Sequence, residues 1–295
     1  MSRISFVGAH TALITPFRDG IVDEESFTSL IEDQVNAGIS GIIPVGTTGE
    51  SPTLTHEEHR RVIEISVTAA DKRTLVIAGT GSNSTTEAIC LTSEAEKLGA
   101  DASLQVAPYY NKPSPEGLYR HFRKIAEAVT IPIILYSIPG RCGIEIPVSV
   151  VVRLAADCAN VVAIKEAGGS VERVNQLRAS LPEEFEILSG DDSLTLPFMS
   201  VGAVGVISVA SNIIPREVQE LVQSFLRGDL ARAQELHQHF YPLFRDLFIE
   251  PNPVPIKTAL ALKDGYSEDV RLPLCEMSAS NQALLIKTLE STGVL

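Results

Sequence analysis

Short apolar runs alternate with longer amphipathic runs along most of the chain. The apolar runs lie at residues 11–17, 41–46, 74–81, 102–110, 131–139, 161–168, 185–192 and 203–211, and an amphipathic run follows each of them. They are too short for buried helices and lack clean alternation, which favours parallel strands buried on both faces. Eight consecutive strand–helix units predict an α/β protein with a (β/α)8 TIM barrel. A doubly wound sheet is the alternative, but its usual GxGxxG turn does not follow residues 11–17.

The last part of the chain contains no such apolar runs. After about residue 230 only helical patterns occur, at residues 230–248, 256–264 and 281–291. We therefore expect a barrel over residues 1–230 and a C-terminal helical region over residues 231–295 that packs on the barrel or on another subunit. Gly38, Gly99 and Gly202 follow amphipathic runs and are predicted to cap the C-termini of helices.

Composition narrows the class of protein. The 295 residues are 44% hydrophobic and 21% charged, which is typical of one large domain with a well-buried core. The formal net charge of −13 argues against a nucleic-acid partner. No apolar run is long enough to predict a membrane span, and no secretory leader pattern is present at the N-terminus. The cysteines lack CxxC spacing, so we expect reduced thiols in a cytoplasmic protein.

Lys165 is the most unusual polar residue of the predicted strands. It interrupts an apolar run, whereas the other seven lysines lie in helical or loop patterns. Active sites of TIM barrels lie at the C-terminal ends of the strands, where Lys165 is expected. Burial would lower its pKa and supply a neutral amine, which forms a Schiff base with a ketone and needs no metal or organic cofactor. The alternative is a structural lysine that reaches solvent or pairs with Glu50, Glu166 or Asp191.

Hydroxyl groups follow three other predicted strands. Thr47 and Thr48 lie in GTTGES at residues 46–51, Tyr109 and Tyr110 end another strand, and Tyr136 ends a third. Hydroxyl groups gathered at one end of a barrel can relay the proton transfers of Schiff-base chemistry. The alternative is that the tyrosines are half-buried packing residues. Because GTTGES lacks the P-loop pattern, we expect it to hold a carboxylate rather than a phosphate.

Two further motifs bear on ligand binding. Arg141 lies in YSIPGRCG at residues 136–143, where it is either a carboxylate clamp or a solvated loop charge. His56 and His59 form HxxH in THEEH, which lacks the spacing of a zinc helix. Thr55 and Glu58 instead predict a capping box at the start of a helix. No other histidine or cysteine cluster predicts a metal site.

Several separate motifs resemble those of the dihydrodipicolinate synthase family, also called 4-hydroxy-tetrahydrodipicolinate synthases. In chain order they are GTTGES, APYYNKPSPEGLYRHF, YSIPGRCG, VVAIKEAGG, SGDD, GVISV and EPNPVPIK. The likeness runs from about residue 6 to the C-terminus, and its specificity lies in the shared order of many motifs. It implies a TIM barrel with C-terminal helices and a homotetramer built from two tight dimers.

The resemblance also implies roles for the matching residues. Lys165 matches the lysine that forms the Schiff base with pyruvate, and Tyr136 matches the tyrosine that moves protons at the imine. Thr48 and Tyr110 match the other members of the proton relay, and Tyr110 would enter the partner's site across the tight dimer interface. The matching substrate-binding and pocket-lining residues are Thr47 together with Thr48, Arg141, Gly190 and Ile207.

The implied reaction is an aldol-type condensation in the diaminopimelate and lysine pathway. Pyruvate forms an imine on Lys165, becomes an enamine and attacks L-aspartate 4-semialdehyde. The amino group of the second substrate then displaces the lysine and closes the ring. The loop YSIPGRCG departs from the common family form YNVPSRTG at Ser137, Gly140 and Cys142, although its tyrosine and arginine remain. This departure concerns the aldehyde subsite rather than the lysine chemistry.

The resemblance also implies an effector site for free L-lysine at the tight dimer interface. Glu87 would meet the ammonium group of the effector, while Asn83 and Tyr109 would meet its carboxylate. The matching residues are Ser51, His56, His59, Asn83, Glu87 and Tyr109. The alternative is that His56 and His59 only begin a helix.

Two other activities are weighed against the synthase. Class I lyases of the same family cleave N-acetylneuraminate or 2-keto-3-deoxy sugar acids, but they generally lack the loop arginine and carry GSTGE or similar. Arg141 and GTTGE therefore favour the synthase. A non-catalytic binding paralogue is disfavoured because Lys165, Tyr136, Thr48, Tyr110 and Arg141 occur together.

Overall fold

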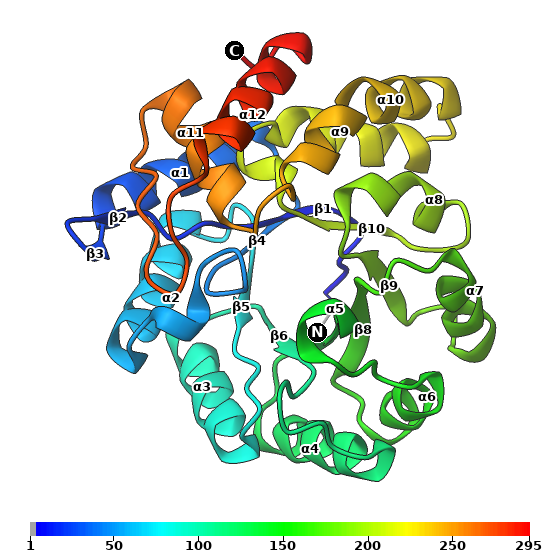
Figure 1. The fold of residues 1–295 in the computed structure, drawn as a ribbon. Coiled ribbons are helices and arrows are strands. Elements are labelled where there is room, and N and C mark those ends of the chain that lie inside the picture. Colours follow the sequence, from blue (N-terminus) through cyan, green and yellow to red (C-terminus); the bar gives the residue numbers. More distant parts are fainter. Residues whose placement is uncertain (1–3) are drawn as a thin grey trace.

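Eight parallel strands close into a barrel in the computed structural model, which describes residues 4–295 (Figure 1). Strand β1 pairs with both β4 and β10, and this pairing closes the ring. The barrel strands are β1 (Gly8–Ala12), β4 (Gly41–Ile43), β5 (Leu75–Gly79), β6 (Ala102–Val106), β7 (Ile133–Ser137), β8 (Val161–Glu166), β9 (Glu186–Ser189) and β10 (Gly205–Ser208). The predicted (β/α)8 barrel is confirmed.

Helices surround the barrel (Figure 1). Short polar side chains begin several of them; the Thr55 hydroxyl, for example, accepts the Glu58 N–H in the predicted capping box. Gly38 and Gly99 end two helices in the left-handed conformation, as predicted, whereas Gly202 lies beyond the end of its helix. The helices are α1 (Glu24–Ala37), α2 (His56–Ala70), α3 (Thr85–Leu98), α4 (Pro115–Ala128), α5 (Pro139–Cys142), α6 (Val148–Asp157), α7 (Val171–Ser180), α8 (Thr195–Met199), α9 (Pro215–Leu226), α10 (Leu230–Asp246), α11 (Val254–Asp264) and α12 (Ala279–Ser291).

The core has two layers, which the alternation of side chains along each strand separates. On β8, Ile164 packs outward with the helices, and Ala163 packs inside the barrel. On β7, Leu135 packs outward, and Ile134 and Tyr136 face inward. Inward positions near the C-terminal ends of these strands are therefore the positions that reach the site.

Three elements differ from the sequence-based expectation. Strand β1 lies at Gly8–Ala12, at the start of the apolar run 11–17, and the end of that run enters a small hairpin of β2 (Phe17–Arg18) and β3 (Ile21–Val22). The loop after β7 contains the one-turn helix α5. The amphipathic run that follows residues 185–192 forms only the five-residue helix α8.

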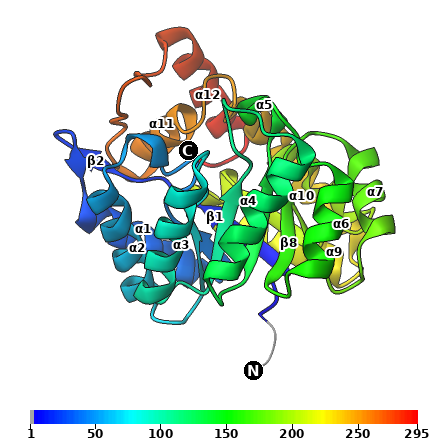
Figure 2. The ribbon, with the colours of Figure 1, turned by 90° about the horizontal axis from the view of Figure 1, so that it is seen from below.

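The C-terminal helices α10, α11 and α12 pack on one another and on the barrel units. Figure 2 shows α11, α12 and α5 at the same end of the molecule, opposite the start of β1. This is the end at which the barrel strands finish, so the C-terminal region is close to the predicted site. Among residues 4–295, no helix has the length and apolar character needed to cross a membrane.

Candidate active site

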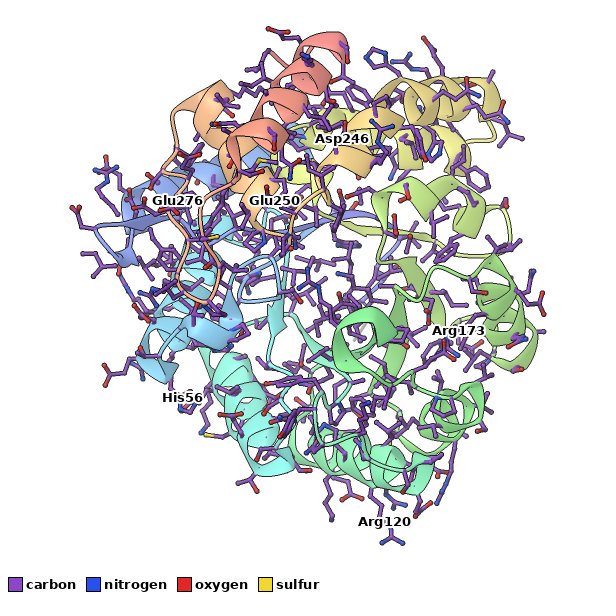
Figure 3. The ribbon with its side chains drawn as sticks, in the orientation of Figure 1. His56, Arg120, Arg173, Asp246, Glu250 and Glu276 are labelled. Carbon is purple, nitrogen blue, oxygen red and sulfur yellow. The ribbon has the colours of Figure 1, made fainter. Side chains whose placement is uncertain are left out.

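Strand β8 directs Lys165 and Glu166 to opposite sides of the barrel wall. Alternation along the strand turns Lys165 inward, while Glu166 contacts Arg173 of α7, whose Nε lies 2.7 Å from the carboxylate. Arg173 also pairs with Glu145 at 3.0 Å and is only 6% exposed (Figure 3). The outer face of the strand is therefore held by a buried ion pair directly behind the lysine.

Lys165 and Tyr136 are neighbours across β7 and β8. The two residues are paired in register, and the Lys165 Nζ lies 4.3 Å from the centroid of the Tyr136 ring. Both side chains are buried, at 6% and 5% exposure. Burial lowers the pKa of Lys165 to about 7, against the opposing effect of Asp192. A large share of neutral amine is thus present at neutral pH, as Schiff-base formation requires.

The carboxylates considered as structural partners of Lys165 are engaged elsewhere. Glu50 pairs with Lys257 and Glu166 pairs with Arg173. Asp191 accepts the Ser193 N–H at 2.9 Å as the cap of a short 3-10 turn, Asp192–Leu194. In the described part of the chain, no ion pair involves Lys165. Its burial also excludes the alternative in which the side chain reaches solvent.

The two threonines of the turn after β4 point to different partners. A side-chain hydrogen bond joins Thr47 and Tyr136, and it opposes the rise that burial causes in the pKa of the phenol. Thr48 instead receives a hydrogen bond of 3.0 Å from the side chain amide of Asn252. Of the two threonines, Thr47 is thus the one bonded to Tyr136, whereas Thr48, which the sequence-based prediction assigned to the proton relay, is bonded to Asn252. Adjacent residues in an irregular turn point in different directions, and no periodicity in the sequence indicates which.

Arg141 lies on α5 at the mouth of the barrel. Its Nη2 donates to the main-chain carbonyl of Asn252 at 3.3 Å, which steers the exposed guanidinium across the opening. It lowers the pKa of both Lys165 and Tyr136, although burial dominates the pKa of each. The arginine is placed to attract an anionic group towards the lysine.

A cavity of about 410 Å³ opens beside these residues. Its walls include Thr47, Tyr136 and Arg141, together with the neighbouring Cys142. The same cavity extends to most of the residues assigned to the lysine effector. Those that line it are Ser51, His56, His59, Glu87 and Tyr109. Thr47, Tyr136 and Arg141 thus share one continuous hollow with these effector residues.

The effector residues form a connected polar cluster. His56 contacts the Glu87 carboxylate at 3.0 Å, and the Ser82 hydroxyl donates to its other oxygen. These contacts hold the pKa of Glu87 below its usual range. His59 is buried, with its Nε2 3.0 Å from the Gly79 carbonyl. His56 stands at the outer rim in Figure 3.

Asn83 and Tyr109 are joined through the main chain. The Asn83 amide donates to the Tyr109 carbonyl at 3.3 Å, and Asn83 is not among the residues that line the cavity. Tyr110 turns away and is 91% exposed, with φ of +70°. The structure therefore does not bring Tyr110 to Lys165 of the same chain.

Two pocket positions lie close to the lysine. Gly190 donates its N–H to the Glu166 carbonyl at 2.8 Å, and a methyl group added to it would stand 2.9 Å from the Lys165 Cε. Ile207 lies on β10 and packs inside the barrel with Tyr136. Both positions, which the resemblance assigns to the pocket, therefore belong to the wall around the lysine.

Three residues near the site received no role from the sequence. Asn252 contacts both Thr48 and Arg141, and Lys257 neutralises Glu50 at the end of the same turn. Asp192 accepts the N–H groups of Val209 and Ala210, both at 3.0 Å, and acts electrostatically on Lys165. A signal for Lys257 did exist, because PVPIKTALAL places one lysine within an apolar run, as at Lys165. Among residues 4–295, no group of three or more His, Cys, Asp and Glu side chains is arranged to hold a metal ion.

A closed barrel with a buried lysine of lowered pKa against a tyrosine has the site of a Schiff-base-forming enzyme. The model of the dihydrodipicolinate synthetase family matches residues 5–292. The chain therefore belongs to this family, and the resemblance noted from its motifs is confirmed.

Relatives that match nearly the whole chain are named as synthases of this family. The 4-hydroxy-tetrahydrodipicolinate synthase of Aquifex aeolicus (strain VF5) is 51% identical over 285 residues, 97% of each chain. The solved 4-hydroxy-tetrahydrodipicolinate synthase of Methylacidiphilum fumariolicum SolV is 55% identical, with a TM-score of 0.97 over 98% of this chain and 96% of that one. The solved synthase of Cyanidioschyzon merolae with lysine bound is 42% identical, with a TM-score of 0.95 over 98% and 99% of the two chains.

Proposed function

We propose that this chain catalyses the condensation of pyruvate with L-aspartate 4-semialdehyde that gives 4-hydroxy-tetrahydrodipicolinate. The observation that carries the proposal is Lys165, buried against Tyr136 with a pKa of about 7. The names of relatives at about 50% identity over nearly the whole chain support the same activity. The reaction belongs to the diaminopimelate and lysine pathway, and its small water-soluble substrates support a cytoplasmic location.

The first half of the reaction makes a carbon nucleophile from pyruvate. The neutral Lys165 amine adds to the keto carbon, and loss of water gives a protonated imine. Loss of a methyl proton then gives the enamine. In our proposal Tyr136 carries these protons, and Thr47, hydrogen bonded to it, extends the relay. Thr48, held by Asn252, helps to place the pyruvate carboxylate.

The second half uses the aldehyde. The enamine carbon attacks the aldehyde carbon, and the new alkoxide takes up a proton. The amino group of the former semialdehyde then attacks the imine carbon, which closes the ring and releases the Lys165 amine. Arg141 holds the carboxylate of the aldehyde at the mouth of the barrel, while Gly190 and Ile207 form the wall beside the lysine.

The decisive experiment is a coupled assay with both substrates on the wild type, Lys165→Ala and Lys263→Ala. Lys263 is a matched control because it is exposed, on α11, and bonded to the Ile213 carbonyl. We expect activity in the wild type and the control and none in Lys165→Ala. Equal rates in all three proteins would exclude the mechanism.

Trapping with borohydride distinguishes the two alternative functions, a non-catalytic binding protein and a class I lyase. Pyruvate and borohydride should leave a covalent adduct on Lys165, and an unchanged protein mass would favour a non-catalytic binding protein. An adduct without condensation, but with cleavage of a longer 2-keto acid, would favour a class I lyase.

We further propose a homotetramer of two tight dimers in which Tyr110 completes the partner's proton relay. The side chain is 91% exposed and held in the left-handed region, which supports a contact outside its own chain. Mixing Tyr110→Phe chains with Lys165→Ala chains tests the idea. If Tyr110 acts across the interface, a mixed dimer regains one complete site, so activity returns on mixing. If the mixture is as inactive as the two separate variants, the proposal that Tyr110 acts across the interface is contradicted.

Feedback inhibition by L-lysine is a second part of the proposal. Glu87 and Tyr109 line the cavity, and the relative from Cyanidioschyzon merolae has lysine bound. We expect millimolar lysine to lower initial rates in the wild type and to act more weakly on Glu87→Gln. Rates unaffected by lysine would contradict an effector site and favour the simpler role of His56 as the start of α2.

A further inference from the structure

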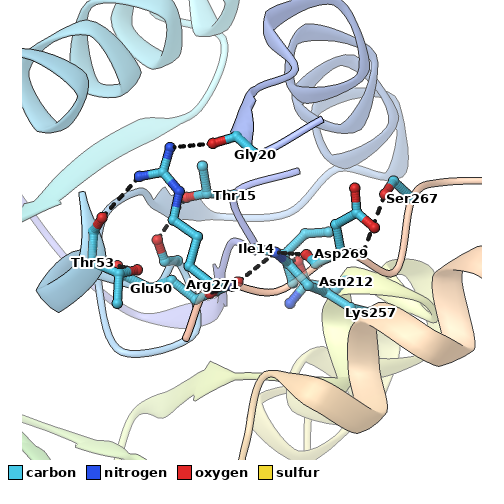
Figure 4. A network of polar contacts seen from close by, with 11 residues as sticks. Ile14, Thr15, Gly20, Glu50, Thr53, Asn212, Lys257, Ser267, Asp269 and Arg271 are labelled. Carbon is cyan, nitrogen blue, oxygen red and sulfur yellow. Dashed lines mark hydrogen bonds and ion pairs between the residues drawn. The ribbon is translucent and has the colours of Figure 1, made fainter. Parts of the chain in front are cut away.

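A buried ion pair joins the C-terminal region to the turn that carries the threonines. Lys257 of α11 is fully buried, and Glu50 is 3% exposed. The Lys257 Nζ donates to one Glu50 oxygen and, at 2.8 Å, to the Asp269 carbonyl. The other Glu50 oxygen accepts the Arg271 N–H at 3.0 Å. Figure 4 shows these contacts converging on the turn.

The same cluster extends to the N-terminal hairpin. Phe17 of β2 makes two cation–π contacts, with Lys257 Nζ at 4.2 Å and Arg271 Cζ at 4.3 Å from its ring centroid. The Arg271 guanidinium donates to the carbonyls of Thr53 and Gly20, both at 2.8 Å. The N-terminal hairpin, the turn at residues 50–53 and the C-terminal region, which are distant in sequence, therefore meet around Glu50.

The turn itself needs such support. Glu50 has φ of +53°, a left-handed conformation that non-glycine residues adopt at a cost and keep only when their surroundings hold them. Thr15 donates to the Gly49 carbonyl at 2.7 Å, and Asn252 donates to Thr48. Contacts thus fix three consecutive residues, and Thr47 is the next residue toward β4.

We propose that Lys257 is a positioning residue for the site. By neutralising Glu50 inside the protein, it holds the turn in the conformation that presents Thr47 to Tyr136. The inference rests on the proposed function, because its effect is on the proton transfers of that reaction. Lys257 touches neither substrate nor reacting atoms and acts through the turn.

The energetics of buried pairs support a role beyond stability. Replacing both members of a buried ion pair by well-packed hydrophobic residues of similar volume is often neutral or stabilising, whereas removing one member leaves an uncompensated charge. Stability of the fold alone therefore does not explain why a lysine and a glutamate are buried here. Their position at the end of the turn that carries Thr47 is explained if the pair positions that turn.

The test separates imine formation from proton transfer. Lys257→Met, Glu50→Gln and the double variant Glu50→Gln/Lys257→Met are incubated with pyruvate and compared with the wild type and the surface control Lys263→Met. Borohydride then measures the final extent of imine on Lys165. Exchange of the pyruvate methyl protons with deuterium in D₂O, followed by NMR, measures passage to the enamine, and thermal unfolding shows which variants are folded.

We expect the double variant to unfold near the temperature of the wild type and to reach the same extent of imine. Its methyl exchange should be slowed about tenfold or more, the size of a misplaced proton relay. Lys257→Met should show the same slow exchange below its unfolding temperature, and Lys263→Met should behave like the wild type. A purely structural role would instead lower imine and exchange together, in proportion to the folded fraction.

Two results would overturn the inference. Exchange at the wild-type rate in the folded double variant would show that the pair does not position the turn. Equal losses of imine and exchange would show that Lys257 serves folding alone. A wild type that forms no imine would instead overturn the proposed function, so the two failures are distinguishable.

Discussion

Lys165 and Tyr136 stand side by side in register, with the ammonium nitrogen 4.3 Å from the centroid of the phenol ring. Parallel pairing of β7 with β8 and the inward turn of both side chains create this relationship. The rigid barrel wall, rather than a mobile loop, therefore places the nucleophile against its proton carrier.

The rate of imine formation should follow the titration of Lys165. With a pKa of about 7, the neutral fraction rises about tenfold between pH 6 and pH 8 and then levels off. Timed borohydride trapping with pyruvate measures this profile. A rate that keeps rising tenfold per pH unit above pH 9 would mean an ordinary lysine pKa and contradict the prediction.

Loss of the Thr47 hydroxyl should mainly lower kcat, whereas loss of the Thr48 hydroxyl should mainly lower the free energy of unfolding. Thr47→Val removes the hydroxyl beside Tyr136, so kcat should fall about 10- to 100-fold while imine still forms. Thr48→Val leaves the Asn252 amide buried without its partner, which should cost about 1–3 kcal/mol of unfolding free energy. Steady-state kinetics and urea unfolding measure both. A larger loss of kcat in Thr48→Val would restore Thr48 to the relay.

Arg141→Ala should weaken binding of the aldehyde more than binding of pyruvate. Loss of a charge-assisted hydrogen bond of about 1.5–3 kcal/mol predicts a rise in the aldehyde KM of about 10- to 100-fold. Separate titrations of the two substrates measure the effect. A greater change in the pyruvate KM would show that Arg141 binds pyruvate rather than the aldehyde and would contradict the prediction.

Gly190→Ala should disturb the lysine, whereas Gly140→Ala should not. A methyl group on Gly190 would lie 2.7 Å from the Ala167 Cβ and 2.9 Å from the Lys165 Cε, so the nucleophile must shift. The same group on Gly140 meets nothing within 4 Å. Since a small misplacement of a reacting group costs up to about 100-fold, we expect a clear loss of kcat/KM in the first variant alone. Equal activities of the Gly190→Ala and Gly140→Ala variants would show that the residues around Gly190 can shift without disturbing Lys165.

Arg173→Met should destabilise the protein strongly. It leaves Glu166, which is fully buried, without its partner, and breaking such a pair costs about 3–5 kcal/mol. Arg73→Met breaks an exposed pair with Glu32, which solvent screens, and should change the unfolding free energy far less. Urea unfolding compares the two. Similar losses would mean that solvent reaches the Glu166 carboxylate.

The sequence predicted those features that follow from periodicity. Repeated short apolar runs predicted the eight strand–helix units, and Lys165 was singled out as the one lysine within a strand pattern. The direction of a side chain within an irregular turn follows no period, so the sequence could not show that Thr47 bonds to Tyr136 and Thr48 to Asn252. The two-residue strands β2 and β3 are too short to leave a pattern.

The partner of a buried helix residue was equally hidden. The apolar run around Lys257 was a signal of its burial, but nothing in the sequence pairs it with Glu50, which is 207 residues away. Asn252 was noted within a family motif, but its contacts with Thr48 and Arg141 depend on how the chain returns to the barrel mouth.

The order in which these parts are synthesised has a consequence for the growing chain. A ribosome makes the chain from its N-terminus, so the eight strands and the reactive lysine exist before Asn252, Lys257 and Arg271 are added. The threonine turn receives its final support from residues that are translated after the whole barrel. A prematurely terminated product that ends after α9 would carry the amine nucleophile without the residues that secure its neighbours.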